Sequence, residues 1–198
     1  MTLLTLVRHG ETDWNRDRLI QGSTDIPLND TGRQQARDAA AALREDLPRH
    51  LPVVVVSSDL SRARETAEII ATELGTAAPR PYADLRERAY GEAEGLDVDE
   101  FRRRWGDWNS ADVPGAETRL QLRDRALRGL RRVVHDTRAA TGAGGATLIA
   151  VAHGALIREV LLHASAGEFP PPGVRLANGS AHPILFERDR LRLASPVA

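Results

Sequence analysis

Short apolar segments recur along the chain and predict β-strands. Three of them are almost continuously apolar: residues 2–7 (TLLTLV), 53–56 (VVVV) and 146–152 (ATLIAVA). Runs of this length without polar alternation are typical of strands that are buried on both faces of a sheet. Two further segments, around 182–187 and 191–194, predict a terminal pair of strands that a tight turn at Arg188–Asp189 would join.

Longer segments with helical spacing separate the predicted strands. Five helices are expected: from about Gly32 to Leu47, and over residues 60–74, 98–108, 117–140 and 155–164. The polar residues 29–31 can cap the first of these helices, and Gly75 can end the second. Residues 76–97 lack a clear period and predict irregular structure, and the glycine cluster at 142–145 predicts a turn.

The alternation of strands with helices predicts the fold class. We expect an α/β fold built as a three-layer sandwich, in which helices cover both faces of a mostly parallel central sheet. The terminal pair of strands would add an antiparallel edge to that sheet. Neither an internal repeat nor a linker-like composition interrupts the pattern, so one domain is expected over residues 1–198.

Composition and charge narrow the possible classes of function. Hydrophobic residues make up 41% of the chain, charged residues 28% and aromatic residues 4%, and the net charge is −1. This favours a folded globular protein, and it does not favour a binder of nucleic acid or of anionic membranes. The apolar run before Arg8 is too short for a signal peptide or a membrane span, so the expected location is the cytoplasm.

Two residue types are absent from the sequence, and each absence excludes a chemistry. Without cysteine there can be no thiolate nucleophile, disulfide or thiolate metal site. All 27 basic residues are arginine, and without lysine there can be no Schiff base and no P-loop lysine. An anion site in this chain must therefore use arginine, histidine and backbone N–H groups. Arginine suits such a site, because its planar guanidinium can donate two hydrogen bonds to one phosphate.

Polar residues directly follow the three continuously apolar strands. Arg8–His9–Gly10 follows the first strand, Ser57–Asp59 with Arg62 the second, and His153–Gly154 the third. Ligands of open α/β sheets bind beyond the carboxyl ends of the strands, so a parallel sheet would bring these segments to one rim. Each residue taken singly has an ordinary explanation as a surface or solvated side chain. Two histidines and two arginines together, beside helix N-termini, favour a site for a dianion.

Five sequence blocks, in this order, resemble those of the histidine phosphatase superfamily, which includes the cofactor-dependent phosphoglycerate mutases. The blocks are Leu6–Thr12 with Asn15; Gln21–Gly22 with Pro27–Leu28, Gly32 and Gln35–Ala36; Ser57–Ala67; Leu85–Glu87 with Gly91 and Glu94–Gly95; and Val151–Gly154. They span nearly the whole chain. The resemblance implies a histidine phosphatase-like domain that transfers a phosphoryl group through a phosphohistidine.

The resemblance also implies a role for each site residue. His9 would be the nucleophile and must be neutral, and the nearby Arg8 and Arg62 would disfavour its protonation. Arg8, Arg62 and His153 would bind the non-bridging oxygens, and Glu87 would act first as general acid and then as base on water. Further substrate contacts are expected from Asn15, Gln21, Gly22, Tyr90 and Gly154. No cofactor is implied, and no metal, because the two histidines lack a cluster of carboxylates at ligand spacing.

The same phosphoenzyme would serve a phosphatase or a mutase. In a phosphatase water attacks the phosphohistidine, and in a mutase the hydroxyl group of a hydroxy acid attacks it. Only residues 96–113 separate the acid/base block from Pro114–Thr118 (PGAET), and this short stretch resembles the small phosphatases. Glu87–Gly91 (ERAYG) instead resembles the mutases. We favour a phosphatase acting on a small phosphate monoester, with a cofactor-dependent phosphoglycerate mutase as the alternative. A non-catalytic phosphate-binding regulatory protein is a further alternative that the complete set of site residues argues against.

The sequence leaves the substrate and the oligomeric state open. Sugar phosphates, phosphoglycerate derivatives, nucleotides and cofactor-precursor phosphates all fit. Residues in segments able to form a lid are Arg18, Arg88, Tyr90, Arg102, Arg103, Arg104, Trp105 and Trp108. Residues 102–104 are expected to be a solvated helix face, and Trp105 and Trp108 to pack on the sheet from one helical face. Arg86 and Arg88 are expected to point away from the site.

Overall fold

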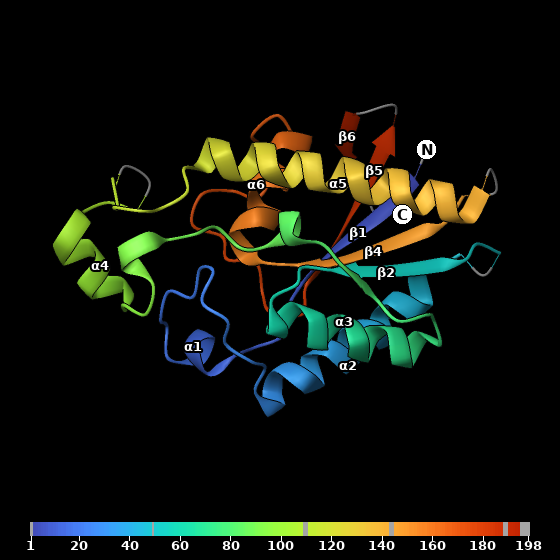
Figure 1. Ribbon diagram of the computed structural model, residues 1–198, viewed down its shortest axis with the longest axis horizontal. Coiled ribbons are helices and arrows are strands. Elements are labelled where there is room, and N and C mark those ends of the chain that lie inside the picture. The colour runs from blue at the N-terminus through green and yellow to red at the C-terminus, as the bar shows by residue number, and fades with distance from the viewer. Residues whose placement is uncertain (1, 49, 109–110, 143–144, 188–189, 195–198) are drawn as a thin grey trace.

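A six-stranded sheet forms the centre of the described fold. The structure is a computed structural model, and it describes residues 2–48, 50–108, 111–142, 145–187 and 190–194. The strands of the sheet are β1 (Thr2–Arg8), β2 (Val53–Ser57), β3 (Arg80–Pro81), β4 (Thr147–Ala152), β5 (Ala181–Glu187) and β6 (Arg190–Leu193). They lie in the order β3-β2-β4-β1-β5-β6. The first four are parallel, whereas β5 and β6 run antiparallel to their neighbours (Figure 1). The predicted parallel sheet with an antiparallel edge is confirmed.

Helices cover both faces of this sheet. The helices of the described residues are α1 (Asp13–Arg16), α2 (Asp30–Asp46), α3 (Ser61–Leu74), α4 (Val98–Trp105), α5 (Arg119–Thr141) and α6 (Gly154–Ala164), with short 3₁₀-helices η1 (Ala83–Leu85) and η2 (Gly91–Ala93), and four of them pack on the sheet. Helices α5 and α6 lie on one face, and α2 and α3 on the other (Figure 1). Leu148 and Ala150 of β4 pack in the cluster with α5 and α6, whereas Ile149 and Val151 pack with α2 and α3. Because successive side chains of a strand point to opposite faces, one continuous apolar run stabilises both layers.

Strand β3 and helix α4 differ from the sequence-based expectation, and the four-residue helix α1 was not expected. Strand β3 lies within residues 76–97, which were expected to be irregular. Its two residues are exposed and pair only with β2, so they leave no apolar pattern in the sequence. The helix expected over 98–108 ends at Trp105, where Gly106 takes a φ of 78° that most other residues avoid.

The aromatic side chains near α4 form a cluster of their own. Phe101 packs against Trp105 and Trp108, with ring centroids 5.5 and 4.4 Å apart. Ile20, Ala93 and Val113 complete the cluster. The expectation that both tryptophans pack on the sheet is wrong, because α4 lies apart from it (Figure 1). The arginines at 102–104 are exposed and pair with acidic residues of their own helix, as expected for a solvated face.

Two sequence-based expectations fall on residues that the structure does not describe. These are the turn at Arg188–Asp189 and the middle of the glycine cluster, at 143–144. Over the described parts of the chain, no helix has both the length and the apolar composition needed to cross a membrane.

The parallel strands bring three distant segments to one edge of the sheet. Arg8 at the end of β1 is in register with Ala152 at the end of β4, and Ser57 at the end of β2 is in register with Val151. The backbone N–H of His9 then donates to Ala152 O at 3.0 Å. The residues that follow these strands therefore share one rim, as the sequence predicted.

Candidate active site

His9 follows β1 directly and is buried, with 3% of its surface exposed. Its Nδ1 lies 2.6 Å from the carbonyl oxygen of Gly10. Because a carbonyl oxygen only accepts hydrogen bonds, Nδ1 must carry the proton, and Nε2 keeps its lone pair. The local backbone therefore selects the tautomer in which Nε2 is free to act as a nucleophile.

The loop that holds His9 is fixed from two sides. On one side the N–H of Gly10 donates to Thr66 Oγ1 at 3.1 Å, and that hydroxyl donates to Arg62 O at 2.7 Å. On the other side Asn178 donates to the carbonyl oxygens of His9 and Gly10 at 3.0 and 3.2 Å. A Cβ on Gly10 would lie 2.2 Å from Gly32 O, so the backbone of this loop packs closely against the first turn of α2.

Arg8 and Arg62 bring two buried guanidinium groups to the rim. Arg62 is fully buried and donates to Thr24 O and Gly22 O at 2.8 Å each, and Arg8 donates to Leu176 O. Neither arginine has an ion pair among the described residues, and the Nε of each lacks a hydrogen-bond partner there. Burial, together with the nearby Arg175, lowers the pKa of Arg8 to about 10, and burial also lowers the pKa of Arg62. Both groups stay cationic at neutral pH, and an incoming anion would supply the missing acceptors.

His153 stands opposite His9 and is completely buried at the N-terminus of α6. The two ring centroids are 5.1 Å apart, and the rings are inclined by 56°. Neither Nδ1 nor Nε2 of His153 has a hydrogen-bond partner in the described structure. Buried polar atoms are normally satisfied, so these unpaired nitrogens leave His153 able to hydrogen-bond a ligand at this rim.

Both imidazoles are held in the neutral form. Burial first, and then the charges of Arg62 and Arg8, lower the pKa of His9 well below its usual value of 6.5. Burial and Arg62 act on the pKa of His153 in the same direction. The expectation that arginines would disfavour protonation of His9 had the right sign, but it omitted desolvation, which is the larger cause.

The neutral imidazoles lead to a prediction about stability and pH. Because folding lowers both histidine pKa values, the unfolded chain binds more protons than the folded chain once the pH falls below about 6.5. We expect the free energy of unfolding to fall with pH there, by up to about 1.4 kcal/mol per pH unit for each histidine. Denaturant titrations between about pH 7.5 and pH 5.5 measure this slope. His153→Gln should flatten it, whereas His163→Gln, at an exposed position of α6, should not. Equal slopes in all three proteins would contradict the assignment.

Glu87 lies in the loop after η1, and its carboxylate rests on the first turn of α6. Its oxygens accept hydrogen bonds from the backbone N–H groups of Ala155 and Leu156 at 3.1 and 3.2 Å, and from Arg88 N at 2.9 Å. This places it beside His153 and Gly154, the residues just before those donors. The guanidinium of Arg86 is bonded to Asp59, away from the site, as expected. That of Arg88 is bonded to the carbonyl oxygen of Glu117 but also lies 5.0 Å from the ring centroid of Tyr90, so Arg88 remains beside an expected substrate contact.

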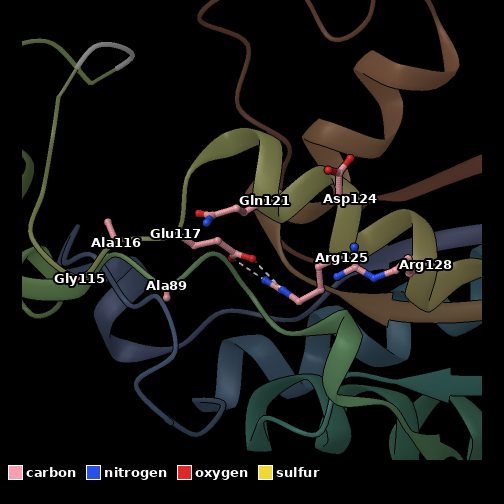
Figure 2. A pocket seen from close by; sticks show the side chains of 8 residues that line it. All are labelled: Ala89, Gly115, Ala116, Glu117, Gln121, Asp124, Arg125 and Arg128. Atoms are coloured by element: carbon pink, nitrogen blue, oxygen red, sulfur yellow. Dashed lines mark hydrogen bonds and ion pairs between the residues drawn. The ribbon is translucent and has the colours of Figure 1, made fainter.

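A partly buried ion pair that the sequence analysis missed holds the Glu87 loop. Arg125 of α5 forms two hydrogen bonds with the carboxylate of Glu117, at 2.7 and 2.8 Å (Figure 2). The same guanidinium donates to the carbonyl oxygens of Asp84, Arg86 and Glu87 at 2.9 to 3.1 Å. The pair lines a pocket of about 520 Å³. One arginine therefore fixes the backbone of the loop that carries the candidate acid.

The five expected substrate contacts fall into two groups. Tyr90 and Gly154 lie near Arg8. Arg8 and Tyr90 are close enough to influence each other's pKa, and a Cβ on Gly154 would lie 3.3 Å from Arg8 Nε. Burial and the charge of Glu87 raise the pKa of Tyr90, so its phenol stays protonated.

The other group supports the site walls. Asn15 accepts from Asn178 Nδ2 at 3.0 Å and from Thr12 N at 3.3 Å, and Gln21 accepts from the Thr12 hydroxyl at 3.0 Å. Gly22 contributes through its carbonyl oxygen, which orients Arg62. Asn178 was missed because a single polar residue in the turn at 177–180 carries no pattern of its own.

The fold and the rim together define an enzyme-like site for a phosphoryl group. Two buried neutral imidazoles face each other, and two unpaired guanidinium nitrogens and a helix N-terminus lie beside them. Residues 4–197 match the family model of the histidine phosphatase superfamily (branch 1). The chain belongs to this superfamily.

Similar proteins include phosphatases and mutases. The uncharacterized phosphatase PhoE of Bacillus subtilis (strain 168) is 37% identical over 98% of this chain and 93% of its own. A 2,3-bisphosphoglycerate-dependent phosphoglycerate mutase of Mesorhizobium japonicum is 33% identical, with coverage of 93% and 91%. The structure of a mycobacterial glucosyl-3-phosphoglycerate phosphatase in complex with VO3 superposes with a TM-score of 0.80, at 29% identity and 98% coverage of both chains.

Proposed function

We propose that this chain hydrolyses a small phosphate monoester through a phosphohistidine on His9. One observation carries the proposal: the proton on Nδ1 of His9 is bonded to Gly10 O, which leaves Nε2 free beside the unpaired nitrogens of Arg8, Arg62 and His153. A nucleophile and the donors for its target phosphate are thus assembled before the substrate arrives.

The reaction would proceed in two displacements at phosphorus. Nε2 of His9 attacks in line, the P–O bond to the leaving group breaks, and Glu87 gives its proton to the departing oxygen. Water then attacks the phosphohistidine, Glu87 takes a proton from it, and the P–N bond breaks to release phosphate and neutral His9. Arg8, Arg62 and His153 donate to the non-bridging oxygens in both steps. Tyr90 and Gly154 would border the substrate, and Asn15, Gln21 and Gly22 would keep the walls in place.

The phosphatase has support from the sequence and from the relatives, and the mutase is the second candidate. The stretch 96–113 is short, as in the small phosphatases, and both PhoE and the mycobacterial protein are named phosphatases. The mutase relatives and the ERAYG segment favour the alternative. A panel of phosphate monoesters separates the two, with 3-phosphoglycerate plus 2,3-bisphosphoglycerate as the mutase test. Release of inorganic phosphate supports the proposal, conversion to 2-phosphoglycerate favours the mutase, and phosphate binding without turnover would favour the regulatory protein.

We expect activity to be independent of divalent metal ions. Arg8 and Arg62 would balance the charge that metal ions balance in other phosphoryl-transfer sites, and the neutral His153 would add a hydrogen bond. Turnover should persist after dialysis against EDTA. Vanadate, which resembles the trigonal-bipyramidal transition state, should inhibit strongly. Complete loss of activity in EDTA that a divalent ion restores would contradict this part of the proposal.

A further inference from the structure

Glu94, at the end of η2, ties together two loops that border the site. Its Oε1 accepts hydrogen bonds from Ser23 N, Ser23 Oγ and Tyr90 N at 2.9 to 3.0 Å. Its Oε2 accepts from Thr24 N at 2.9 Å and from Thr24 Oγ1 at 2.6 Å. A single carboxylate thus takes three backbone and two hydroxyl donors, from segments about 70 residues apart in sequence.

The loop that Glu94 holds is the loop that holds Arg62. Gly22 O and Thr24 O accept from the two terminal nitrogens of Arg62, at 2.8 Å each. Gly22 has a φ of 57°, and a Cβ there would lie 2.0 Å from Oε1 of Glu94, so the carboxylate packs directly on this loop. Because Arg62 is fully buried and lacks an ion pair among the described residues, these two carbonyl oxygens decide where its guanidinium lies.

We propose that Glu94 is a positioning residue that aims Arg62 at the phosphoryl group through the Gly22–Thr24 loop. The hydrogen bond from Tyr90 N to Glu94 also fixes the position of the loop that follows Glu87. The inference rests on the proposed function, in which Arg62 binds the non-bridging oxygens.

The surroundings of Glu94 also keep its carboxylate charged. Burial raises the pKa of this carboxyl, but the hydrogen bonds from Thr24, Ser23 and Tyr90 outweigh burial and hold the pKa below its usual value. A carboxylate that stays charged and accepts five hydrogen bonds from two loops is suited to fixing those loops relative to each other.

The first test is Glu94→Gln, which keeps the shape of the side chain but replaces one acceptor oxygen with an NH₂ group. That group cannot accept hydrogen bonds. If it replaces Oε1, the bonds from Ser23 and Tyr90 are lost, and if it replaces Oε2, the bonds from Thr24 are lost. We expect vanadate and inorganic phosphate to bind on the order of tenfold more weakly. KM should rise equally for alkyl and aryl phosphates, and the ratio of their rates should not change. Glu92→Gln is the matched control, because Glu92 is an exposed carboxylate of the same 3₁₀-helix.

A double-mutant cycle with Arg62→Ala tests whether Glu94 acts through Arg62. In the Arg62→Ala background, Glu94→Gln should weaken vanadate binding little further, whereas independent roles would give additive losses and overturn the inference. Thr24→Val removes one hydroxyl donor and keeps the carboxylate, so it carries the test if Glu94→Gln does not fold. It should weaken vanadate binding in the same direction, by less.

Two outcomes separate this inference from the proposed function. If Arg62→Ala weakens vanadate binding but Glu94→Gln and Thr24→Val leave it unchanged, only the role of Glu94 is overturned. If Arg62→Ala itself leaves vanadate binding unchanged, the proposed function fails and the inference with it. A selective loss of alkyl phosphate turnover in Glu94→Gln would make Glu94 the acid and would also overturn the inference.

Discussion

Replacing His9 with alanine is expected to lower kcat by a factor of about 10⁴ or more, because it removes the atom that forms the covalent intermediate. Nε2 of His9 is the free nitrogen of a neutral, buried imidazole whose other nitrogen is fixed to Gly10. Rapid quenching during turnover of the unsubstituted protein should trap a phosphoenzyme that is labile in acid and stable in base, as phosphoramidates are. Mass spectrometry after an alkaline quench should place the phosphate on His9.

Two comparisons make the His9 experiment decisive. His163→Ala, at an exposed position of α6, should leave kcat unchanged and shows that the loss is specific to the site. His153→Ala should reduce turnover and yet still allow phosphate to be trapped on His9, because His153 is proposed to bind oxygen atoms only. Phosphate recovered on a serine or on His153, together with an active His9→Ala variant, would refute the assignment of the nucleophile.

Glu87→Gln is expected to slow hydrolysis of alkyl phosphates by about 10²- to 10⁴-fold, the usual contribution of a positioned general acid. An alkoxide is a poor leaving group and needs a proton, whereas p-nitrophenolate leaves without one. The same substitution should therefore slow the phosphorylation step much less with p-nitrophenyl phosphate. The rate of phosphoenzyme formation must be measured for both substrates, because the second step also uses Glu87.

Glu92→Gln serves as the control for Glu87 as well, because it removes an exposed carboxylate from the same region of the chain. Its rates should match those of the unsubstituted protein with both substrates. Equal slowing of alkyl and aryl phosphates in Glu87→Gln, or no slowing of either, would remove Glu87 from the role of acid. Glu92 would by then have been tested through its control variant, so Glu94 would be the next carboxylate to compare, although its hydrogen bonds to two loops favour a positioning role.

The sequence predicted the fold through features that are local in the chain. Segments such as VVVV and ATLIAVA are apolar on both sides of a strand, so they can be stable only between two layers of helices. The positions of His9 and His153 follow from the same feature, because each comes directly after a strand and parallel strands end at one edge. The two-residue strand β3 was missed because it carries no apolar pattern of its own.

Only the tertiary structure decided how the site residues are oriented. Arg125 reaches the Glu87 loop across about 40 residues of sequence, and Asn178 reaches the His9 loop across about 170. Glu94 joins Ser23 and Thr24 in the same way, through their backbone N–H groups. These contacts are single polar side chains that bond to backbone atoms of distant loops. Such contacts have no sequence period, because they depend on the path of the chain after folding. The sequence by itself therefore determined which groups reach the rim, and the folded structure determined where they point.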